Sequence, residues 1–151
     1  MEKITIQSDI NKMNAVEAFI SDICDTYNIN NYAAAIAMSL IPAVENAIVH
    51  GNNSDPSKFV TISCERCRGG VTISVSDMGD GFDYSAFGDI PTSDEKGIGI
   101  YMMKTLSDQL SFENNGSTVR MTFFINGIDS SRALERSSRI KEYYSEKVLQ
   151  S

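Results

Sequence analysis

The sequence predicts an α+β fold, a two-layer sandwich in which helices cover one face of a mixed, mostly antiparallel sheet. Three observations predict it. Short segments with strictly alternating apolar residues are typical of strands that bury one face. Longer segments carry apolar residues at helical spacing. The length of 151 residues, of which 42% are hydrophobic, suits one domain with a core of its own.

The first half of the chain contains one expected strand and two expected helices. Residues 3–6 alternate in polarity, which predicts a strand. Ser8 and Asp9 are expected to cap a helix that extends to residue 27. Residues 32–50 predict a second, alanine-rich helix. Pro42 lies inside it, and because proline lacks an amide proton we expect a kink or a break there.

The second half predicts four strands and one helix. Residues 60–64 and 71–76 alternate on either side of a glycine turn, as the strands of a hairpin do. A third helix is expected over residues 98–110. Strands over residues 110–114 and 118–126 are then joined by an Asn-Asn-Gly turn.

Residues 127–151 differ from the predicted domain of residues 1–126. They are charged and rich in serine, with a weak apolar row. We expect this tail to be helical or partly disordered. Two interpretations stay open, a frayed helix in solvent and a docking segment for a partner.

The charge of the chain limits its partners. Lys and Arg total 13 and Asp and Glu total 20, so the net charge is 13 − 20 = −7. Because nucleic acids and membrane surfaces attract basic patches, neither is expected as a partner. No apolar run long enough to span a bilayer is expected, and residues 1–5 show no secretory signal.

Three cysteines, an odd number, favour a reducing cytoplasm over a disulfide framework. Cys64 and Cys67 have the spacing of a metal or redox pair. Structural zinc needs four ligands, however, and His50 is the only histidine. We therefore interpret the pair as two small thiols beside a hairpin turn.

The first motif lies on the second expected helix. Pro42, Asn46 and His50 are spaced by four and so share one row. Asparagine is a poor helix former, but its amide oxygen is a suitable ligand for Mg²⁺. The alternative is an asparagine that caps a neighbouring loop.

The second motif is Asp77-x-Gly79-x-Gly81-Phe82. Asp77 has the parity of the buried residues of the preceding strand, so its carboxylate should point inward. A buried carboxylate requires hydrogen-bond donors, and the exocyclic amine of adenine is one. Gly79 and Gly81 allow the backbone to approach a ligand closely. The alternative is an ordinary Asp-Gly turn.

The third motif is Lys96-Gly97-Ile98-Gly99 at the start of the third expected helix. Glycines before a helix expose backbone amides where phosphate binds readily. The preceding loop, residues 83–95, is long and polar enough to act as a lid.

In this order the motifs resemble those of the Bergerat-fold, histidine-kinase-like ATPases. Asn46 matches the N-box, and the two Gly-x-Gly motifs match the two glycine boxes. Gly116 and Ser117 resemble the glycine–hydroxyl pair of the closing strand. Within this superfamily the chain is most similar to the bacterial anti-sigma-factor serine/threonine kinases.

The resemblance implies a Mg-ATP site between the second helix, the sheet and the lid, with Asn46 as the metal ligand. It implies that the protein binds a sigma factor, and that it phosphorylates a serine or threonine of an antagonist protein in a partner-switching system that controls transcription. It also implies pairing as a homodimer. The residues expected to contact the nucleotide are Asn46, His50, Asp77, Gly79, Gly81, Phe82, Lys96, Gly97, Ile98, Gly99 and Ser117.

One position departs from the family. Where these kinases carry a glutamate general base, four residues before Asn46, this chain has Pro42. Glu45 lies about 100° around the helix from Asn46 and should point elsewhere. Glu45 and His50 are therefore weak candidates for the base, and the catalytic residue stays unassigned.

Two alternatives to a kinase of this kind remain. The first is a binding module that sequesters its partner in an ATP-dependent way without phosphorylating it. The second is a histidine-kinase catalytic domain that acts on another protein. Gyrase-like or chaperone-like action would need further domains.

Overall fold

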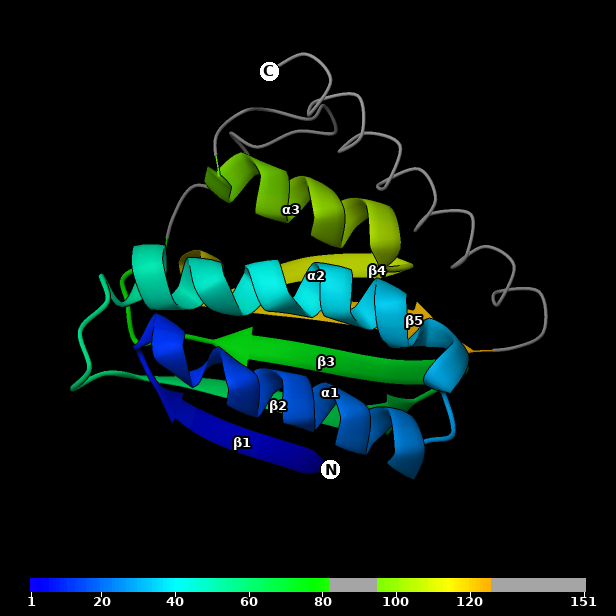
Figure 1. The fold of residues 1–151 in the computed structure, drawn as a ribbon. Helices are drawn as coiled ribbons and strands as arrows, with labels where there is room; N and C mark the ends of the chain where they lie inside the picture. The colour runs from blue at the N-terminus through cyan, green and yellow to red at the C-terminus, as the bar shows by residue number, and fades with distance from the viewer. Residues whose placement is uncertain (82–94, 126–151) are drawn as a thin grey trace, which may run out of the picture.

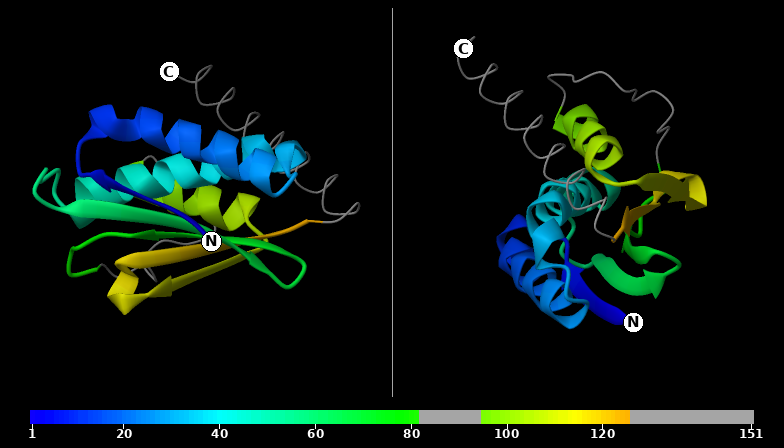
Figure 2. Two further views of the ribbon diagram at one scale, coloured as in Figure 1. Left: turned by 90° about the horizontal axis from the view of Figure 1, so that it is seen from below. Right: turned by 90° about the vertical axis from the view of Figure 1, so that its right-hand side faces the viewer.

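The computed structural model describes residues 1–81 and 95–125, without the side chains of residues 95 and 96. In this part of the chain, five strands form one sheet in the order β1-β2-β3-β5-β4, and every neighbouring pair is antiparallel. The helices lie on one face of the sheet (Figures 1 and 2). The predicted α+β sandwich is thereby confirmed.

The helices and strands largely follow the predicted pattern. The strands are β1 (Glu2–Gln7), β2 (Phe59–Cys67), β3 (Gly70–Ser76), β4 (Gln109–Glu113) and β5 (Thr118–Phe124), and the helices are α1 (Met13–Thr26), α2 (Ala33–Asn46) and α3 (Glu95–Leu106). Phe82, most of the predicted lid and the predicted tail of residues 127–151 lie outside the described residues.

Several boundaries differ from the predicted ones. Of the two predicted capping residues, Asp9 caps the chain after β1, and it begins a 3-10 turn that precedes α1. α3 ends at Leu106, four residues before the predicted end. The reason is pairing with β5, because the amide of Asp108 donates to the carbonyl of Thr122 (2.8 Å) and its carboxylate accepts from the amide of Phe124 (2.7 Å).

The core lies between the sheet and the helices. The alternating residues of β2, β3 and β5 supply one side of it, and the apolar stripes of α1 and α2 supply the other. Among the described residues, eleven large side chains are almost completely buried: Phe123, Ile23, Ile36, Leu40, Ile48, Ile62, Ile73, Ile100, Met103, Leu106 and Met121.

α2 is not broken at Pro42, contrary to one of the two outcomes that we expected. After Asn46 the chain continues as a π-helical turn, Ala47–Gly51.

The stretch Asn30–Gly51 has 22 residues and is long and apolar enough to cross a bilayer, which corrects the expectation that no such run exists. Half of it is buried within the fold, as is typical of a core helix.

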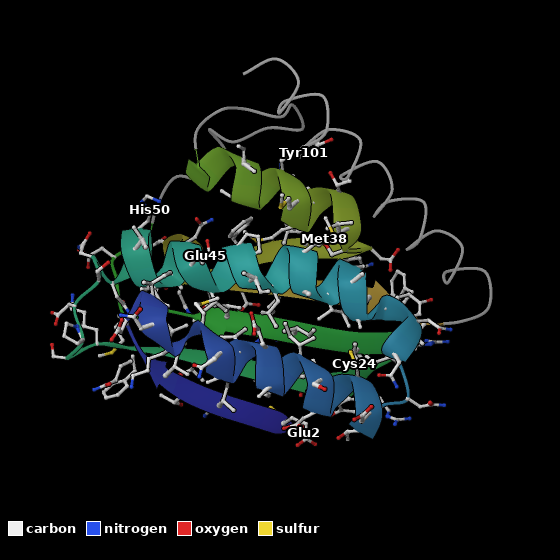
Figure 3. All side chains as sticks on the ribbon, in the orientation of Figure 1. Glu2, Cys24, Met38, Glu45, His50 and Tyr101 are labelled. Atoms are coloured by element: carbon white, nitrogen blue, oxygen red, sulfur yellow. The ribbon has the colours of Figure 1, made fainter. Side chains whose placement is uncertain are left out.

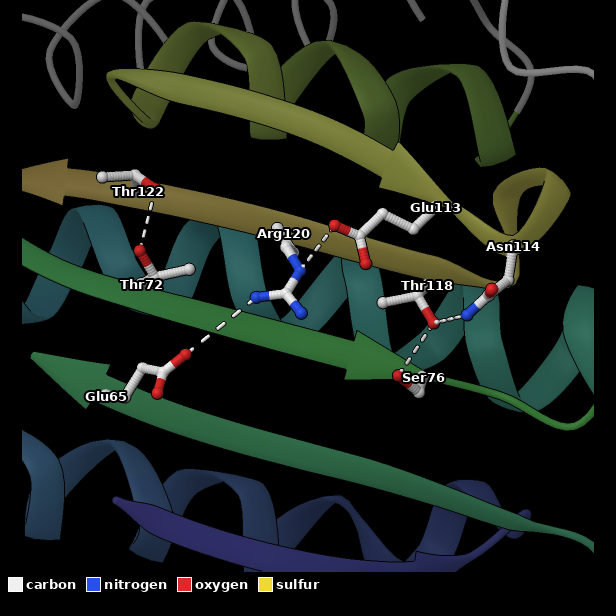
Figure 4. A network of polar contacts seen from close by, with 8 residues as sticks. All are labelled: Glu65, Thr72, Ser76, Glu113, Asn114, Thr118, Arg120 and Thr122. Carbon is white, nitrogen blue, oxygen red and sulfur yellow. Dashed lines mark hydrogen bonds and ion pairs between the residues drawn. The ribbon is translucent and has the colours of Figure 1, made fainter. Parts of the chain in front are cut away.

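The other face of the sheet is polar. Arg120 lies near its middle and pairs with Glu113 (2.9 Å) and, at 4.0 Å, with Glu65 (Figure 4). Hydroxyl pairs link neighbouring strands on this face, Thr72 with Thr122 at 3.0 Å and Ser76 with Thr118 at 2.9 Å.

Candidate functional site

A pocket opens between α2, the sheet and the turn that joins β4 to β5. It encloses roughly 460 Å³ of space, including its open mouth. Its polar side chains are those of Asn46, His50, Asp77 and Ser117. Apolar residues form most of the remaining wall: Ala43, Ala47, Val75, Ile100, Met103, Phe112 and Val119. An apolar wall with few polar groups suits a flat, partly polar ligand such as a nucleobase.

Asp77 lines the pocket directly after β3, together with Val75. The parity that the sequence indicated therefore holds. Oδ1 of Asp77 accepts a hydrogen bond from the amide of Gly79 (2.8 Å), and the amide of Asp77 donates to the carbonyl of Ser117 (2.9 Å). Oδ2 lies against Gly51, where a Cβ atom would be only 2.3 Å away. Both the backbone and the carboxylate of Asp77 are thus fixed by neighbouring segments.

Gly79 and Gly81 are required by the packing of backbone against backbone. A Cβ atom on Gly79 would lie 2.2 Å from the carbonyl oxygen of Gly51. One on Gly81 would lie 2.1 Å from the carbonyl oxygen of Asn115, and Gly81 also has a φ of +87°. The sequence argument assigned these glycines to close approach by a ligand, whereas the structure shows close approach by two other segments of the chain.

Asn46 and Pro42 face α3. A Cβ atom on Gly99 would lie 2.8 Å from Nδ2 of Asn46 and 3.3 Å from Cβ of Pro42. The predicted row of residues on α2 therefore packs on the first turns of α3. This places the amide of Asn46 beside the fifth residue of α3, one turn after the helix start.

The remaining residues of the third motif lie beside this contact. Gly97 and Gly99 are buried in the first two turns of α3 and do not line the pocket. Ile98 packs with Met102 and Leu106 in a separate small cluster. The side chain of Lys96 lies outside the described part of the chain.

The two candidate bases differ in position. His50 is exposed and lines the edge of the pocket, at the end of the π-helical turn (Figure 3). Glu45 is half-buried on α2 and does not line the pocket, in agreement with its expected direction (Figure 3).

The residues present fit a divalent cation held mainly by a nucleotide. Within residues 1–81 and 95–125, no group of three or more His, Cys, Asp or Glu is placed to hold a metal ion. Mg²⁺ commonly takes one or two protein oxygens together with phosphates and water, so the amide oxygen of Asn46 would be sufficient as its protein ligand. Cys64 is buried in the sheet, and burial raises its pKa to about 12.

Sequence reasoning missed two parts of this site. Ile100, Met103 and Phe112 follow ordinary core periodicity, and only the three-dimensional packing shows a pocket beside them. Asn52, two residues after His50, has no role in the sequence prediction, although its side chain is completely buried. A polar residue directly after a Gly was the available signal, and it is a weak one.

Comparison with known proteins gives a consistent result. Residues 6–123 match the family model of the histidine kinase-like ATPase domain. The chain is 28% identical over 119 residues to the serine-protein kinase RsbW of Bacillus subtilis (strain 168), covering 72% of each chain. It is 31% identical over 117 residues to the anti-sigma F factor of Clostridium botulinum (strain Alaska E43 / Type E3), covering 71% of this chain and 79% of the relative.

Proposed function

Because the chain belongs to the histidine kinase-like ATPase family, and within it to the anti-sigma-factor serine kinases, we propose that it binds Mg-ATP and phosphorylates an antagonist protein. The hydroxyl oxygen of a serine or threonine attacks the γ-phosphorus, the bond to the β-phosphate oxygen breaks, and ADP leaves. The hydroxyl proton passes to solvent or to phosphate oxygen.

The observation that carries the proposal is the pocket with Asp77 in its wall and Asn46 facing the start of α3. Asp77 accepts a hydrogen bond from the adenine amine, and the apolar wall contacts the base. Asn46 would hold Mg²⁺ against the phosphates, and the amide of Gly97 lies in the first turn of α3, whose positive end favours phosphate. Gly99 lets Asn46 come close to this helix. His50, Gly81 and Ser117 line the same pocket and complete the proposed nucleotide contacts, together with Lys96 and Phe82. Gly79 and Ile98 support the site through their packing.

The proposal extends to partners and location. The anti-sigma-factor relatives support a sigma factor and an antagonist protein as the two partners, and transcription as the process controlled. Three free cysteines agree with the reducing cytoplasm. We further propose that residues 1–126 form the ATP-binding domain, that residues 127–151 form a tail and that the chain pairs as a homodimer.

One observation favours a second function, that of an ATP-dependent binding module without kinase activity. Pro42 stands beside Asn46 and Gly99, in the place where the family carries its glutamate, and proline cannot accept a proton. Loss of a general base typically lowers the rate by about 10²–10⁴-fold, while positioning and charge stabilisation are retained. The two functions therefore differ in rate, not in nucleotide binding.

Calorimetric titration of Mg-ATP, repeated without Mg²⁺, tests the shared part of both functions. We expect binding that weakens when Mg²⁺ is removed. Absence of binding at millimolar nucleotide would contradict both functions and leave the fold as a scaffold for protein partners.

Phosphoryl transfer from radiolabelled ATP to a purified antagonist then separates the two functions. We expect Pro42→Glu to raise the transfer rate by about 10²-fold or more, since it restores a carboxylate one helical turn before Asn46. Pro42→Ala is the matched control, because it removes the proline without adding a base. Equal rates in both variants would show that a missing base does not limit this chain.

A further inference from the structure

Asn52 lies directly after the π-helical turn of residues 47–51, and its side chain is completely buried. Its Oδ1 accepts a hydrogen bond from the amide of Met78 at 2.8 Å. Its Nδ2 donates to Oγ of Ser8 at 2.8 Å and to the carbonyl of Phe59 at 3.0 Å. One side chain therefore joins the end of β1, the start of β2 and the loop after β3.

The bond to Met78 matters because of the position of this residue in the loop. Met78 lies between Asp77 and Gly79, whose amide donates to Oδ1 of Asp77 at 2.8 Å. The Sδ atom of Met78 also accepts from the amide of Phe59 at 3.3 Å, so both its backbone and its exposed side chain are tied. The loop that carries the Asp77 carboxylate is thus held from outside the pocket, by a residue that does not line it.

We infer that Asn52 is a positioning residue for nucleobase recognition, which acts by holding the Asp77–Gly79 loop through its Oδ1. This inference rests on the proposed ATP site. A hydrogen bond between a carboxylate and the adenine amine requires the carboxylate to stay within a few tenths of an ångström of its place. Without Oδ1 of Asn52, the amide of Met78 loses its partner and the loop can shift relative to Gly51.

The oxygen and the nitrogen of the Asn52 side chain have different partners. A role in positioning the Asp77–Gly79 loop can therefore be distinguished from a general contribution to the stability of the fold. Nδ2 bonds to Ser8 and Phe59, which lie outside the pocket, and only Oδ1 reaches the loop. Ser8→Ala removes one Nδ2 partner, together with the bond from Oγ of Ser8 to the carbonyl of Lys58 (2.9 Å), and leaves the Oδ1 bond intact. Asn52→Asp keeps an acceptor oxygen for Met78, whereas Asn52→Ala removes it.

The experiment measures, for the wild-type chain and these three variants, the Kd of Mg-ATP, the Kd of magnesium tripolyphosphate and the melting temperature. Tripolyphosphate carries the phosphates of ATP without the base. We expect Asn52→Ala to weaken ATP binding about tenfold and to leave tripolyphosphate binding unchanged, since a factor of ten corresponds to about one hydrogen bond.

The other variants complete the test. Ser8→Ala should lower the melting temperature with both affinities unchanged. Asn52→Asp should retain the wild-type ratio of the two dissociation constants, even if its added charge weakens both. If Asn52→Ala does not fold, Asn52→Leu takes its place, because leucine fills a similar volume and has no acceptor for the amide of Met78.

Two results would overturn the inference. In one, Asn52→Ala weakens both ligands equally. In the other, Ser8→Ala changes ATP affinity as much as Asn52→Ala does. A wild-type chain that binds neither ligand would instead overturn the proposed ATP site itself. If the wild-type chain binds ATP, the ATP site stands, and the variants then test only the role of Asn52.

Discussion

At the scale of single residues, Asp77 shows how one carboxylate can serve structure and recognition at once. Its Oδ1 accepts from the amide of Gly79, and its Oδ2 faces Gly51 at the pocket. The hydrogen bond to Oδ1 fixes the side-chain torsion of Asp77, and this torsion fixes the direction of Oδ2. Recognition therefore depends on the chemical identity of Oδ2 as well as on its position.

Asp77→Asn tests this division. The amide oxygen can still accept from Gly79, but an NH₂ group then stands where the adenine amine would donate. We expect ATP binding to weaken by about 1.5–3 kcal/mol, the range for a hydrogen bond to a charged group, as measured by calorimetry. Asp80→Asn is the control, because it removes the same charge from an exposed position three residues away. Equal effects of the two variants would show that only charge is involved.

At the scale of elements, the pocket is closed where the loop after β3 meets the turn between β4 and β5. Gly81 lies directly against the carbonyl of Asn115, and the amide of Asp77 donates to the carbonyl of Ser117. Asn114, Asn115 and Gly116 all have positive φ, between 52° and 97°, so this turn has a narrow choice of shapes. Two short segments far apart in the sequence therefore meet at the wall of the pocket.

Gly81→Ala should disturb this contact. The new Cβ atom would meet the carbonyl of Asn115 at 2.1 Å, so one segment must move. We expect a loss of about 1–2 kcal/mol in the free energy of unfolding from the left-handed backbone alone, together with weaker ATP binding. Chemical denaturation and calorimetry measure the two effects.

Gly69→Ala is the matched control for this prediction. Gly69 has a similar φ of +85° in the turn between β2 and β3, and a Cβ atom there would be 3.7 Å from its nearest neighbour. Gly69→Ala should lower the free energy of unfolding without weakening ATP binding. Unchanged ATP binding in Gly81→Ala would show that the contact with Asn115 does not shape the site.

At the scale of the whole molecule, burial separates the three thiols. Cys24 and Cys64 are buried in the core, while Cys67 is partly exposed at the end of β2. Desolvation is the main cause that raises the pKa of Cys64 to about 12, and it also raises the pKa of Cys24. Folding therefore favours the protonated form of these two thiols.

The raised pKa of Cys64 predicts that stability depends on pH in alkaline solution. The unfolded chain releases this proton near pH 9.0 and the folded chain near pH 12, so between these values the folded state binds more protons. The free energy of unfolding should therefore fall as pH rises above about 9, by up to about 1.4 kcal/mol per pH unit from this group. Urea denaturation at several pH values measures the slope.

Cys64→Ala isolates this contribution from those of other groups that titrate in the same range. The variant should be less stable at neutral pH, because it leaves a cavity, but its stability should fall less steeply above pH 9. Identical slopes in the two proteins would contradict the assignment to Cys64.

The sequence determined the class of the fold and the order of its elements, because alternation and helical spacing depend on neighbours a few residues apart. It also placed Asp77 on the buried face and predicted the row of Pro42 and Asn46, since both follow from parity and helical period. The three motifs further indicated the family that the comparisons confirm.

Only the tertiary structure decided how these residues meet. Gly99 packs on Asn46, Gly51 on Asp77 and Gly81 on Asn115. These contacts join segments 26 to 53 residues apart, which no local pattern encodes. The role of Asn52 also depends on contacts between distant segments, because its partners lie in three different parts of the chain. Local periodicity fixes which face a side chain presents, whereas the packing of distant segments fixes what that face touches.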